Sequence, residues 1–426
     1  MTCVRYEKRE EEMRKIKKVL SAVLAATMVM ALCACGGTAE TETAAKATDT
    51  EAAPAAASDV KVGFIFLHDE NSTYDLNFIN GATQACEAAG VEYMLKTNIP
   101  EGQECYEAAC ELADAGCDIV FADSFGHEDY MIEAAKEYPN VQFCHATGTK
   151  AHTEGLSNYH NAFATIFEGR YLAGIAAGMK LNEMIANGEI TADQTKIGYV
   201  GAYTYAEVIS GYTSFFLGAR SVCPTATMEV TFTGSWYDET AEKEGANKLI
   251  EDGCVLLSQH ADSMGAPTAC EKAGIPDISY NGSTASACPN TFIVSSRIDW
   301  APYFAYIIDA VANGKEIATD WVGTLETGSV VLTDLGSAAA EGTAEAIEEA
   351  KKAMNAGTLH VFDTTTFTVN GETLTSYMAD VDTDPEYTAD TEVITDGYFA
   401  ESGSEFRSAP YFDLQIDGIS LLDTAY

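Results

Sequence analysis

Apolar segments alternate with amphipathic ones along the chain from residue 60 onward. VKVGFIFL (60–67) is apolar without interruption, which is typical of a strand covered on both faces. Helical spacing of apolar residues follows over 77–89, and Gly90 stands where that helix should end. The pattern predicts further strands at 91–96, 117–122, 141–146, 196–201, 227–232, 254–259, 276–280 and 291–296. It predicts further helices at 101–115, 127–138, 162–181, 206–220, 238–252 and 263–273.

The strand–helix alternation occurs in two series, and the second begins at residue 196. Such alternation predicts right-handed βαβ units and parallel sheets. Residues 58–426 exceed a single compact core, so we expect an α/β protein with two doubly wound lobes. Gly169, Gly174 and Gly178 lie on the predicted helix over 162–181 and favour close packing against a neighbouring element. The Thr-, Asp- and Tyr-rich stretch 358–426 predicts hairpins on the second lobe.

A secretory signal of the lipoprotein kind precedes these units. Four basic residues within 14–18 come before the apolar stretch 19–32, which is shorter than the roughly 20 residues that span a bilayer. We expect residues 1–34 to be removed and Cys35 to carry lipid; an ordinary secretory signal with an incidental cysteine is the alternative. Residues 1–12 are unusually acidic for such a signal, so Met13 is the better start. Residues 35–57 predict a flexible tether.

The charge and the cysteines narrow the function. A formal net charge of −41 repels polyanions, which argues against nucleic acid as a partner. Nine cysteines follow Cys35, an odd number without C-x-x-C or zinc spacing, so we interpret them as small buried hydrophobic residues. Asp380-x-Asp382-x-Asp384 is similar to the start of a calcium loop. Pro385 and Thr391 replace its turn glycine and final glutamate, so we expect no metal.

Motifs of common enzyme classes are missing from the chain. We find no G-x-S-x-G elbow, no phosphate-binding glycine loop and no H-E-x-x-H. We therefore expect a binding protein without a cofactor, and not an enzyme.

Six loops after predicted strands hold the candidate binding chemistry, because ligands of open α/β sheets bind beyond the carboxyl ends of the strands. The loops are 68–75, 123–129, 202–207, 234–238, 259–265 and 280–286. They bring together aromatic, amide and carboxylate side chains. This collection favours a flat aromatic ligand that stacks between rings and is held at its edges by Asp or Asn.

Seven blocks make the chain resemble a known family: KVGFIFLHDENSTYD, FADSFGHEDYMIEAAKEYPNVQFCHATG, FEGRYLAGIAAG, KIGYVGAYTYAEVISGYTSFFLGARSV, GSWYDETAEKEGANKLIEDG, LSQHADS and SRIDWAPYF. In this order they resemble the basic membrane protein family of ABC-transporter substrate-binding lipoproteins, which includes a purine nucleoside receptor. The resemblance implies a periplasmic-binding-protein type I fold with a hinge and an interlobe cleft. We expect one lobe at about 58–165 plus about 290–330, and the other at about 166–289 plus about 331–426.

The resemblance also implies residues that contact ligand. Tyr74 and Phe125, with Ser124 beside it, are the candidate aromatic walls, and Trp236 is expected to line the cleft. Tyr74 and Phe125 have the alternative of being core aromatics at strand ends. Asp238 resembles a carboxylate that grips ribose hydroxyls or a base edge; it is equally suited to cap the helix at 238–252.

Other candidates come from the same blocks and their neighbours. Gln259, His260 and Asp262 match the Q-H-x-D-S block, with an interior histidine as the alternative for His260. Asn281 stands where relatives carry Asp-rich residues. This difference leaves open whether the ligand is a purine base or a nucleoside. The last two candidates are Glu207, which has the alternative of a favourable charge near a helix dipole, and Trp300, for which hinge packing is the alternative.

The family implies a function for the whole chain. We expect a lipid-anchored protein on the extracytoplasmic face of the cell membrane that captures a purine nucleoside or base for an ABC permease and its ATPase. The alternatives are a ligand-sensing module for a membrane receptor, binding of a sugar or another small solute, and a secreted nucleosidase.

Overall fold

The computed structural model describes residues 59–381, 391–402 and 407–426, which belong to one compact unit. The predicted signal, Cys35, the tether and two of the three aspartates of the calcium-like motif lie outside the described residues. Among the helices of the described part, none combines the length and the apolar character needed to cross a membrane.

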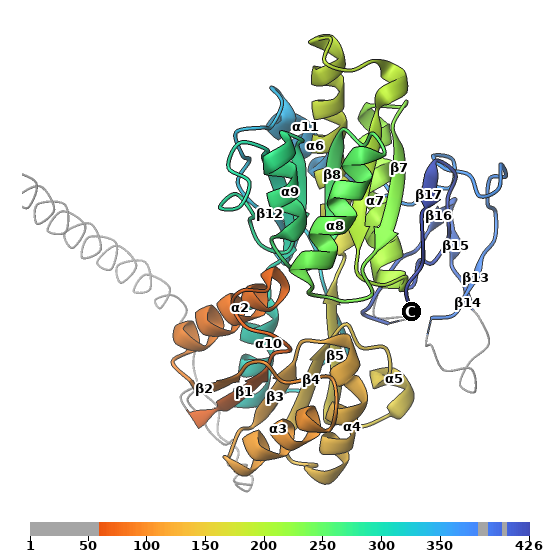
Figure 1. Ribbon diagram of the computed structural model, residues 1–426. Helices are drawn as coiled ribbons and strands as arrows, with labels where there is room; N and C mark the ends of the chain where they lie inside the picture. The colour runs from red at the N-terminus through yellow and green to blue at the C-terminus, as the bar shows by residue number, and fades with distance from the viewer. Residues whose placement is uncertain (1–58, 382–390, 403–406) are drawn as a thin grey trace, which may run out of the picture. The chain divides into compact units, whose positions relative to one another are not determined.

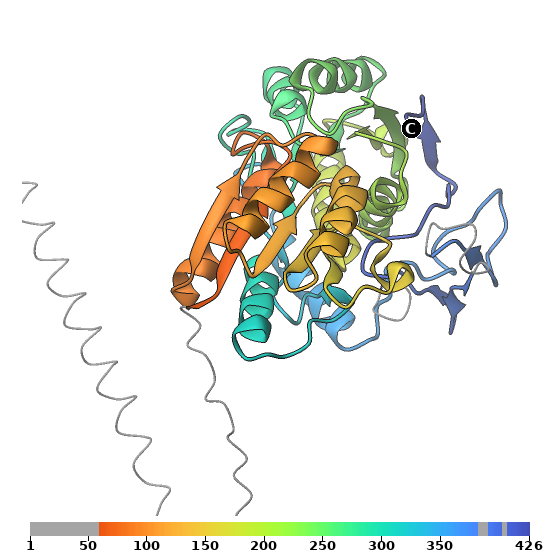
Figure 2. The ribbon, with the colours of Figure 1, turned by 90° about the horizontal axis from the view of Figure 1, so that it is seen from below.

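The first sheet contains six strands, all parallel (Figures 1 and 2). Their spatial order is β11 (Asp320–Gly323), β5 (Tyr159–Ala164), β4 (Gln142–Ala146), β3 (Ile119–Ala122), β1 (Lys61–Ile65) and β2 (Glu92–Lys96). Helices cover both faces. One layer contains α2 (Thr73–Ala89) and α10 (Ala301–Ala312); the other contains α3 (Gln103–Asp114) and α4 (Glu128–Glu137). Successive residues of β1 and β3 point into opposite layers, which explains their uninterrupted apolar sequence.

The second sheet contains seven strands, and β12 alone among them is antiparallel to its neighbour. Their order is β12 (Val330–Leu332), β10 (Phe292–Ile298), β9 (Asp277–Tyr280), β8 (Leu256–His260), β6 (Lys196–Gly201), β7 (Thr227–Phe232) and β17 (Ile419–Leu421). The helices α6 (Ile166–Ala186), α7 (Ala206–Val222) and α11 (Thr343–Asn355) pack in the core on one face, and α8 (Glu239–Glu251) and α9 (Gly265–Ala273) on the other.

Within residues 59–381 the chain crosses between the sheets three times, after β5, after β10 and after β11. The crossing segments are bonded to one another: the amide of Thr165 donates to the carbonyl of Gly323 over 2.8 Å, and the amide of Asp299 to that of Ser329 over 2.7 Å. The segment about 290–330 is thus divided, because β10 pairs in the second sheet while α10 and β11 belong to the first.

The structure differs from the predicted elements at two helix starts. The helix predicted over 162–181 begins at Ile166, because residues 159–164 are wholly buried and form β5 instead. The helix predicted from residue 77 begins at Thr73, where the Ser72 hydroxyl accepts from the amide of Asp75 and caps it.

The predicted close packing of the glycine-rich helix is confirmed. A Cβ at Gly174 of α6 would lie 2.0 Å from the carbonyl oxygen of Phe215 in α7, so only glycine fits there. The nine cysteines after Cys35 are all free, and all except the partly exposed Cys110 are buried, as expected of small hydrophobic residues.

The C-terminal stretch contains antiparallel pairs, as predicted, and one strand that was not. The pairs join β13 (Met378–Ala379) to β14 (Thr391–Glu392) and β15 (Ile394–Thr395) to β16 (Tyr398–Phe399). The strand that was not predicted is β17, which adds to the second sheet in parallel with β7. Buried side chains of this stretch, Phe362 and Phe412 among them, pack into the core of the second sheet.

Candidate functional site

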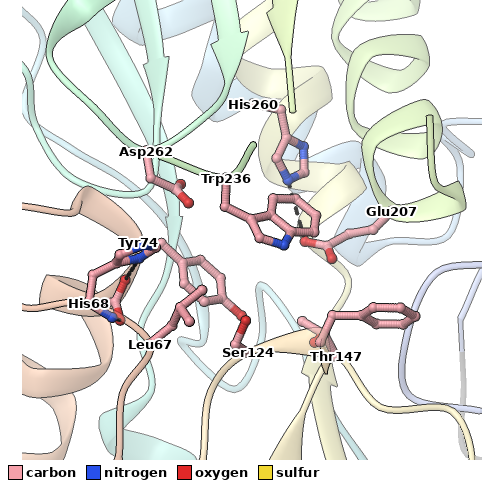
Figure 3. A pocket seen from close by; sticks show the side chains of 11 residues that line it. Leu67, His68, Tyr74, Ser124, Thr147, Glu207, Trp236, His260 and Asp262 are labelled. Carbon is pink, nitrogen blue, oxygen red and sulfur yellow. Dashed lines mark hydrogen bonds and ion pairs between the residues drawn. The ribbon is translucent and has the colours of Figure 1, made fainter. Parts of the chain in front are cut away.

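A cavity lies beyond the carboxyl ends of strands from both sheets (Figure 3). The empty space between its walls, open solvent at the mouth included, is about 360 Å³. The lining side chains are Leu67, His68, Tyr74, Asp75, Ser124, Phe125 and Thr147 from the first half of the fold, and Glu207, Trp236, His260 and Asp262 from the second. We call this space the ligand cavity.

On the first-sheet side, the polar groups are already bonded within the protein. Tyr74, in the first turn of α2, donates its hydroxyl to the carbonyl of Asp123 over 2.8 Å. The hydroxyl of Ser124 donates to Glu101 over 2.6 Å. Asp75 accepts from the amide of His68 over 2.7 Å and from the hydroxyl of Ser72 over 2.6 Å. Because these hydroxyl and carboxyl groups already have partners within the protein, this side offers a ligand mainly the surface of aromatic rings. Phe125 is 40% exposed.

On the second-sheet side, the lining contains two acidic residues, Glu207 and Asp262, and the indole ring of Trp236. Glu207, in the first turn of α7, lies 3.4 Å from the Nε2 atom of His260. The Trp236 ring lies 5.0 Å from that of Tyr203 in an edge-on arrangement. Asp262 accepts from the side-chain amide of Asn281 over 3.2 Å. Figure 3 shows Tyr74, Trp236 and Glu207 facing one space from opposite sides. Stacking surface and carboxyl groups therefore converge.

The two sides touch each other around the ligand cavity. The amide of Thr73, at the start of α2, donates to the carbonyl of Asp262 over 3.0 Å. The rings of His68 and Tyr237 lie 5.5 Å apart, and those of Phe125 and Tyr205 lie 5.6 Å apart. These contacts join the two halves directly, as in a closed binding protein.

Burial controls the ionisation of the cavity groups. It raises the pKa of Asp262 well above its usual range, and the nearby carboxyls of Asp75, Glu242 and Glu207 raise it further. Burial also lowers the pKa of His260, against the opposing effect of Glu207. For Asp75, burial acts upward, but hydrogen bonds from His68 and Ser72 outweigh it and lower the pKa. A neutral Asp262 both donates and accepts a hydrogen bond, whereas an ionised Asp75 only accepts.

Among the predicted ligand residues, Tyr74, Ser124, Phe125, Glu207, Trp236, His260 and Asp262 line the ligand cavity. Asp238, Gln259, Asn281 and Trp300 are not among its lining residues.

The structure gives each of these four another role. Asp238 is exposed and caps α8, accepting from the amides of Thr240 and Ala241. Gln259 is buried and donates to the carbonyl of Ala261 over 2.7 Å. Asn281 has a positive φ of 68° and holds Asp262. Trp300 is 1% exposed and stacks on Phe78, with ring centres 4.3 Å apart.

Four lining residues were not among the candidates: Leu67, His68, Asp75 and Thr147. His68 and Asp75 lie within the loop 68–75, from which the resemblance implies only Tyr74 as a ligand residue. Thr147 follows β4, whose loop was not selected although the rule of strand carboxyl ends applies to it equally. Its φ of 65° is unusual for threonine and is not visible in the sequence.

Comparisons with known proteins match one family over most of the chain. The family described as ABC transporter substrate-binding protein PnrA-like matches residues 66–360. A putative ABC transporter glucose-binding protein of Haloferax volcanii is 30% identical over 71% of this chain and 73% of its own length. A purine-binding protein of Brucella abortus is 32% identical over 60% of this chain and 69% of its own.

The fold has solved counterparts. An ABC-transporter solute-binding protein of Conexibacter woesei superposes with a TM-score of 0.58 at 20% identity, covering 71% of this chain and 98% of that one. The predicted α/β architecture of the periplasmic-binding-protein type I class is confirmed.

Proposed function

The chain belongs to the Bmp family of ABC-transporter substrate-binding proteins, and we propose that it captures a purine base or nucleoside in the ligand cavity and delivers it to a membrane permease. Members of this family bind solute outside the cytoplasm and are not enzymes, so nucleosidase activity is not expected.

The observation that carries the proposal is the pairing of ring surfaces with carboxyl groups. Phe125 and Trp236 come from opposite halves and offer apolar faces to a planar ring. Asp262 and Glu207 offer polar groups for its edge, and burial raises the pKa of Asp262, which favours its protonated form. A purine edge alternates donors and acceptors, which such a carboxyl pairs with through both of its oxygens.

The mechanism is capture followed by closure. A ligand that contacts Phe125 from one half and Trp236 from the other stabilises the closed arrangement over the open one. The contact between Thr73 and Asp262 then forms the rim of the closed cavity. The permease then binds the closed form that holds the ligand, as the family's role in transport implies.

Glucose is the competing ligand, because one relative is named as a putative glucose-binding protein. Aromatic rings also support the apolar face of a sugar. The cavity favours a purine because three rings, those of Tyr74, Phe125 and Trp236, share a lining that contains few hydroxyl-binding amides.

The test is titration calorimetry of the purified full-length protein with adenine, adenosine, guanosine and glucose. We expect a purine to bind, and Phe125→Ala to weaken its binding by about 5- to 150-fold, since stacking of a base on an aromatic ring contributes about 1–3 kcal/mol. Leu95→Ala removes an exposed apolar side chain on β2, which contributes no residue to the cavity lining, and serves as the control. Glucose binding with no response to any purine would contradict the proposal.

We further propose that Cys35 carries the lipid that keeps the protein at the membrane. The basic cluster, the short apolar stretch and Cys35 have the order of a lipoprotein signal. Cys35→Ser should move the protein from the membrane fraction to the soluble fraction, while Cys33→Ser, two residues away, should not. Equal membrane retention of both variants would exclude this anchor.

A further inference from the structure

A second space of about 1010 Å³ adjoins the ligand cavity. It shares Phe125, Thr147, Glu207 and Trp236 with that cavity, so these four side chains stand between the two spaces and border both. Its other walls include Arg407, Ala409, Pro410, Tyr411 and Asp413. We call this space the outer chamber.

The wall formed by residues 407–413 lies beyond residue 360, where the family match ends. This segment is fixed to its surroundings. The amide of Ser408 donates to the Asp320 carboxylate of β11 over 3.1 Å, and the amide of Tyr411 donates to Glu401 over 3.2 Å. The outer chamber is therefore a built part of this chain and not a gap beside a loose tail.

Arg407 is the unusual group of this wall. Its side chain is 2% exposed, and its Nε atom donates to the carbonyl of Ala409 over 3.1 Å. One terminal nitrogen, Nη2, donates to the carbonyl of Pro410. The other, Nη1, is buried and has no hydrogen-bond partner among the described residues. A buried guanidinium donor without a partner is costly, and an oxygen of a bound ligand would satisfy it.

The charged residues that line the outer chamber indicate which kind of ligand oxygen could accept from Arg407. Glu207, Asp380 and Asp413 line the same space as Arg407. Three carboxyl groups near one guanidinium disfavour a phosphate or carboxylate ligand by like-charge repulsion. A hydroxyl both donates and accepts, so it pairs with Arg407 and with a carboxylate at once. A neutral hydroxylated group fits this lining best.

We propose that the outer chamber receives a sugar ring, with Arg407 Nη1 donating to a sugar hydroxyl oxygen. The inference rests on the proposed function: the purine lies in the ligand cavity, and its ribose extends past Glu207 and Trp236 into the outer chamber. The residues beyond the family match thus make the protein a nucleoside receptor in preference to a base receptor.

The test compares base with nucleoside in wild-type protein and in Arg407→Gln, by titration calorimetry with adenine, adenosine, AMP, ribose and glucose. We expect wild-type protein to bind adenosine more tightly than adenine, and AMP less tightly than adenosine. Arg407→Gln should weaken adenosine by about 10- to 100-fold, as for loss of a hydrogen bond to a charged group, and leave adenine within about 2-fold. Arg407→Lys keeps the charge and should fall between. The control is Lys248→Gln, which removes an exposed positive charge paired with Asp252 on α8.

The outcomes separate this inference from the proposed function. If adenine and adenosine weaken equally in Arg407→Gln, or if neither changes, the sugar site is wrong while the purine cavity stands. If free glucose or ribose binds and depends on Arg407 while no purine binds, the proposed function fails, and with it the nucleoside assignment. Melting temperatures of the variants show whether a loss for both ligands reflects misfolding, in which case Arg407→Lys decides.

Discussion

The two halves of the molecule support their cavity side chains in different ways. In the first half the support is aromatic: Trp300 stacks on Phe78, whose ring lies 4.8 Å from that of Tyr74 at the cavity wall. Phe121 and Phe304 continue this cluster beneath the sheet. A chain of rings thus connects the interior of this half directly to the ligand cavity.

In the second half the support is a buried cation. Arg170 of α6 is fully buried, and its guanidinium donates to the carbonyls of Gln259 over 3.2 Å and of Ser279 over 3.5 Å, at the ends of β8 and β9. It also lies 4.8 Å from the centre of the Tyr280 ring. No ion pair to Arg170 occurs among the described residues. Directional hydrogen bonds thus fix the strand ends that carry His260.

The difference has a physical reason. Ring surfaces tolerate small shifts, because apolar contact is not directional. A carboxyl group that forms hydrogen bonds with the edge of a ligand needs a fixed orientation as well as a fixed position. In the first half, aromatic packing supports the rings that line the ligand cavity. In the second half, hydrogen bonds support the strand ends that carry the acidic groups.

The largest expected effects come from removing each support in turn. Trp300→Ala should destabilise the protein by about 3–5 kcal/mol through the cavity it leaves. Arg170→Met keeps volume but leaves the acceptors of four strands, β6, β8, β9 and β10, without their donor, at about 2–4 kcal/mol. Amide hydrogen exchange should localise the loosening to β1 and β3 in Trp300→Ala, and to β8 and β9 in Arg170→Met.

Ligand binding sharpens this contrast. At temperatures where both variants stay folded, Arg170→Met should weaken binding more, because it displaces the strand end that precedes Asp262. Exposed Lys315→Met is the matched control for loss of a positive charge. If both variants loosen both sheets to the same extent, the halves share one support and the comparison fails.

Much of the fold follows from the sequence because the buried strands are short apolar runs between glycines and amphipathic helices. The exceptions have local causes. β5 contains His160 and Asn161, both buried and polar, so its apolar residues were assigned to the next helix. β11 and β12 are short strands at the crossing segments, where pairing with other parts of the chain decides the conformation.

The candidate site was predictable to the extent that loop position determines it. Tyr74, Phe125 and Trp236 are conspicuous residues in loops at strand ends, and they reach the ligand cavity. Trp300 follows a strand in the same way but turns into the core against Phe78. The direction of a side chain depends on packing that a single sequence does not display. The position of Arg407 is harder still to predict from the sequence, because only the fold brings it to the same space as Phe125 and Glu207.

The smallest expected effect concerns pH and the loop that carries Asp262. Glu242 of α8 is buried and accepts from the amides of Ser263 over 3.2 Å and of Asp238 over 3.1 Å. Burial raises its pKa to about 7. Because the folded value exceeds the ordinary one near 4.5, the protonated form favours folding below pH 4.5, and this stability is lost as the pH rises to about 7.

Glu242→Gln keeps an acceptor without a titrating group, so its stability should fall less than that of the wild-type protein in that window, where Asp277 and Glu401 also titrate because burial raises their pKa values to about 6 and about 8. Denaturant unfolding at pH 4.5 and pH 7.5 should show a wild-type loss that exceeds the variant's by about 1–3 kcal/mol. Glu239→Gln, at an exposed position in the same helix, should keep the wild-type difference. The first half contains a buried carboxyl of its own, Asp123, whose pKa burial raises. The exchange rates of its strands, corrected for intrinsic pH dependence, should therefore respond to pH to the same extent in wild-type protein and in Glu242→Gln. If Glu242→Gln reduced the pH response of both sheets equally, Glu242 would act on the whole fold and not on the acidic half alone.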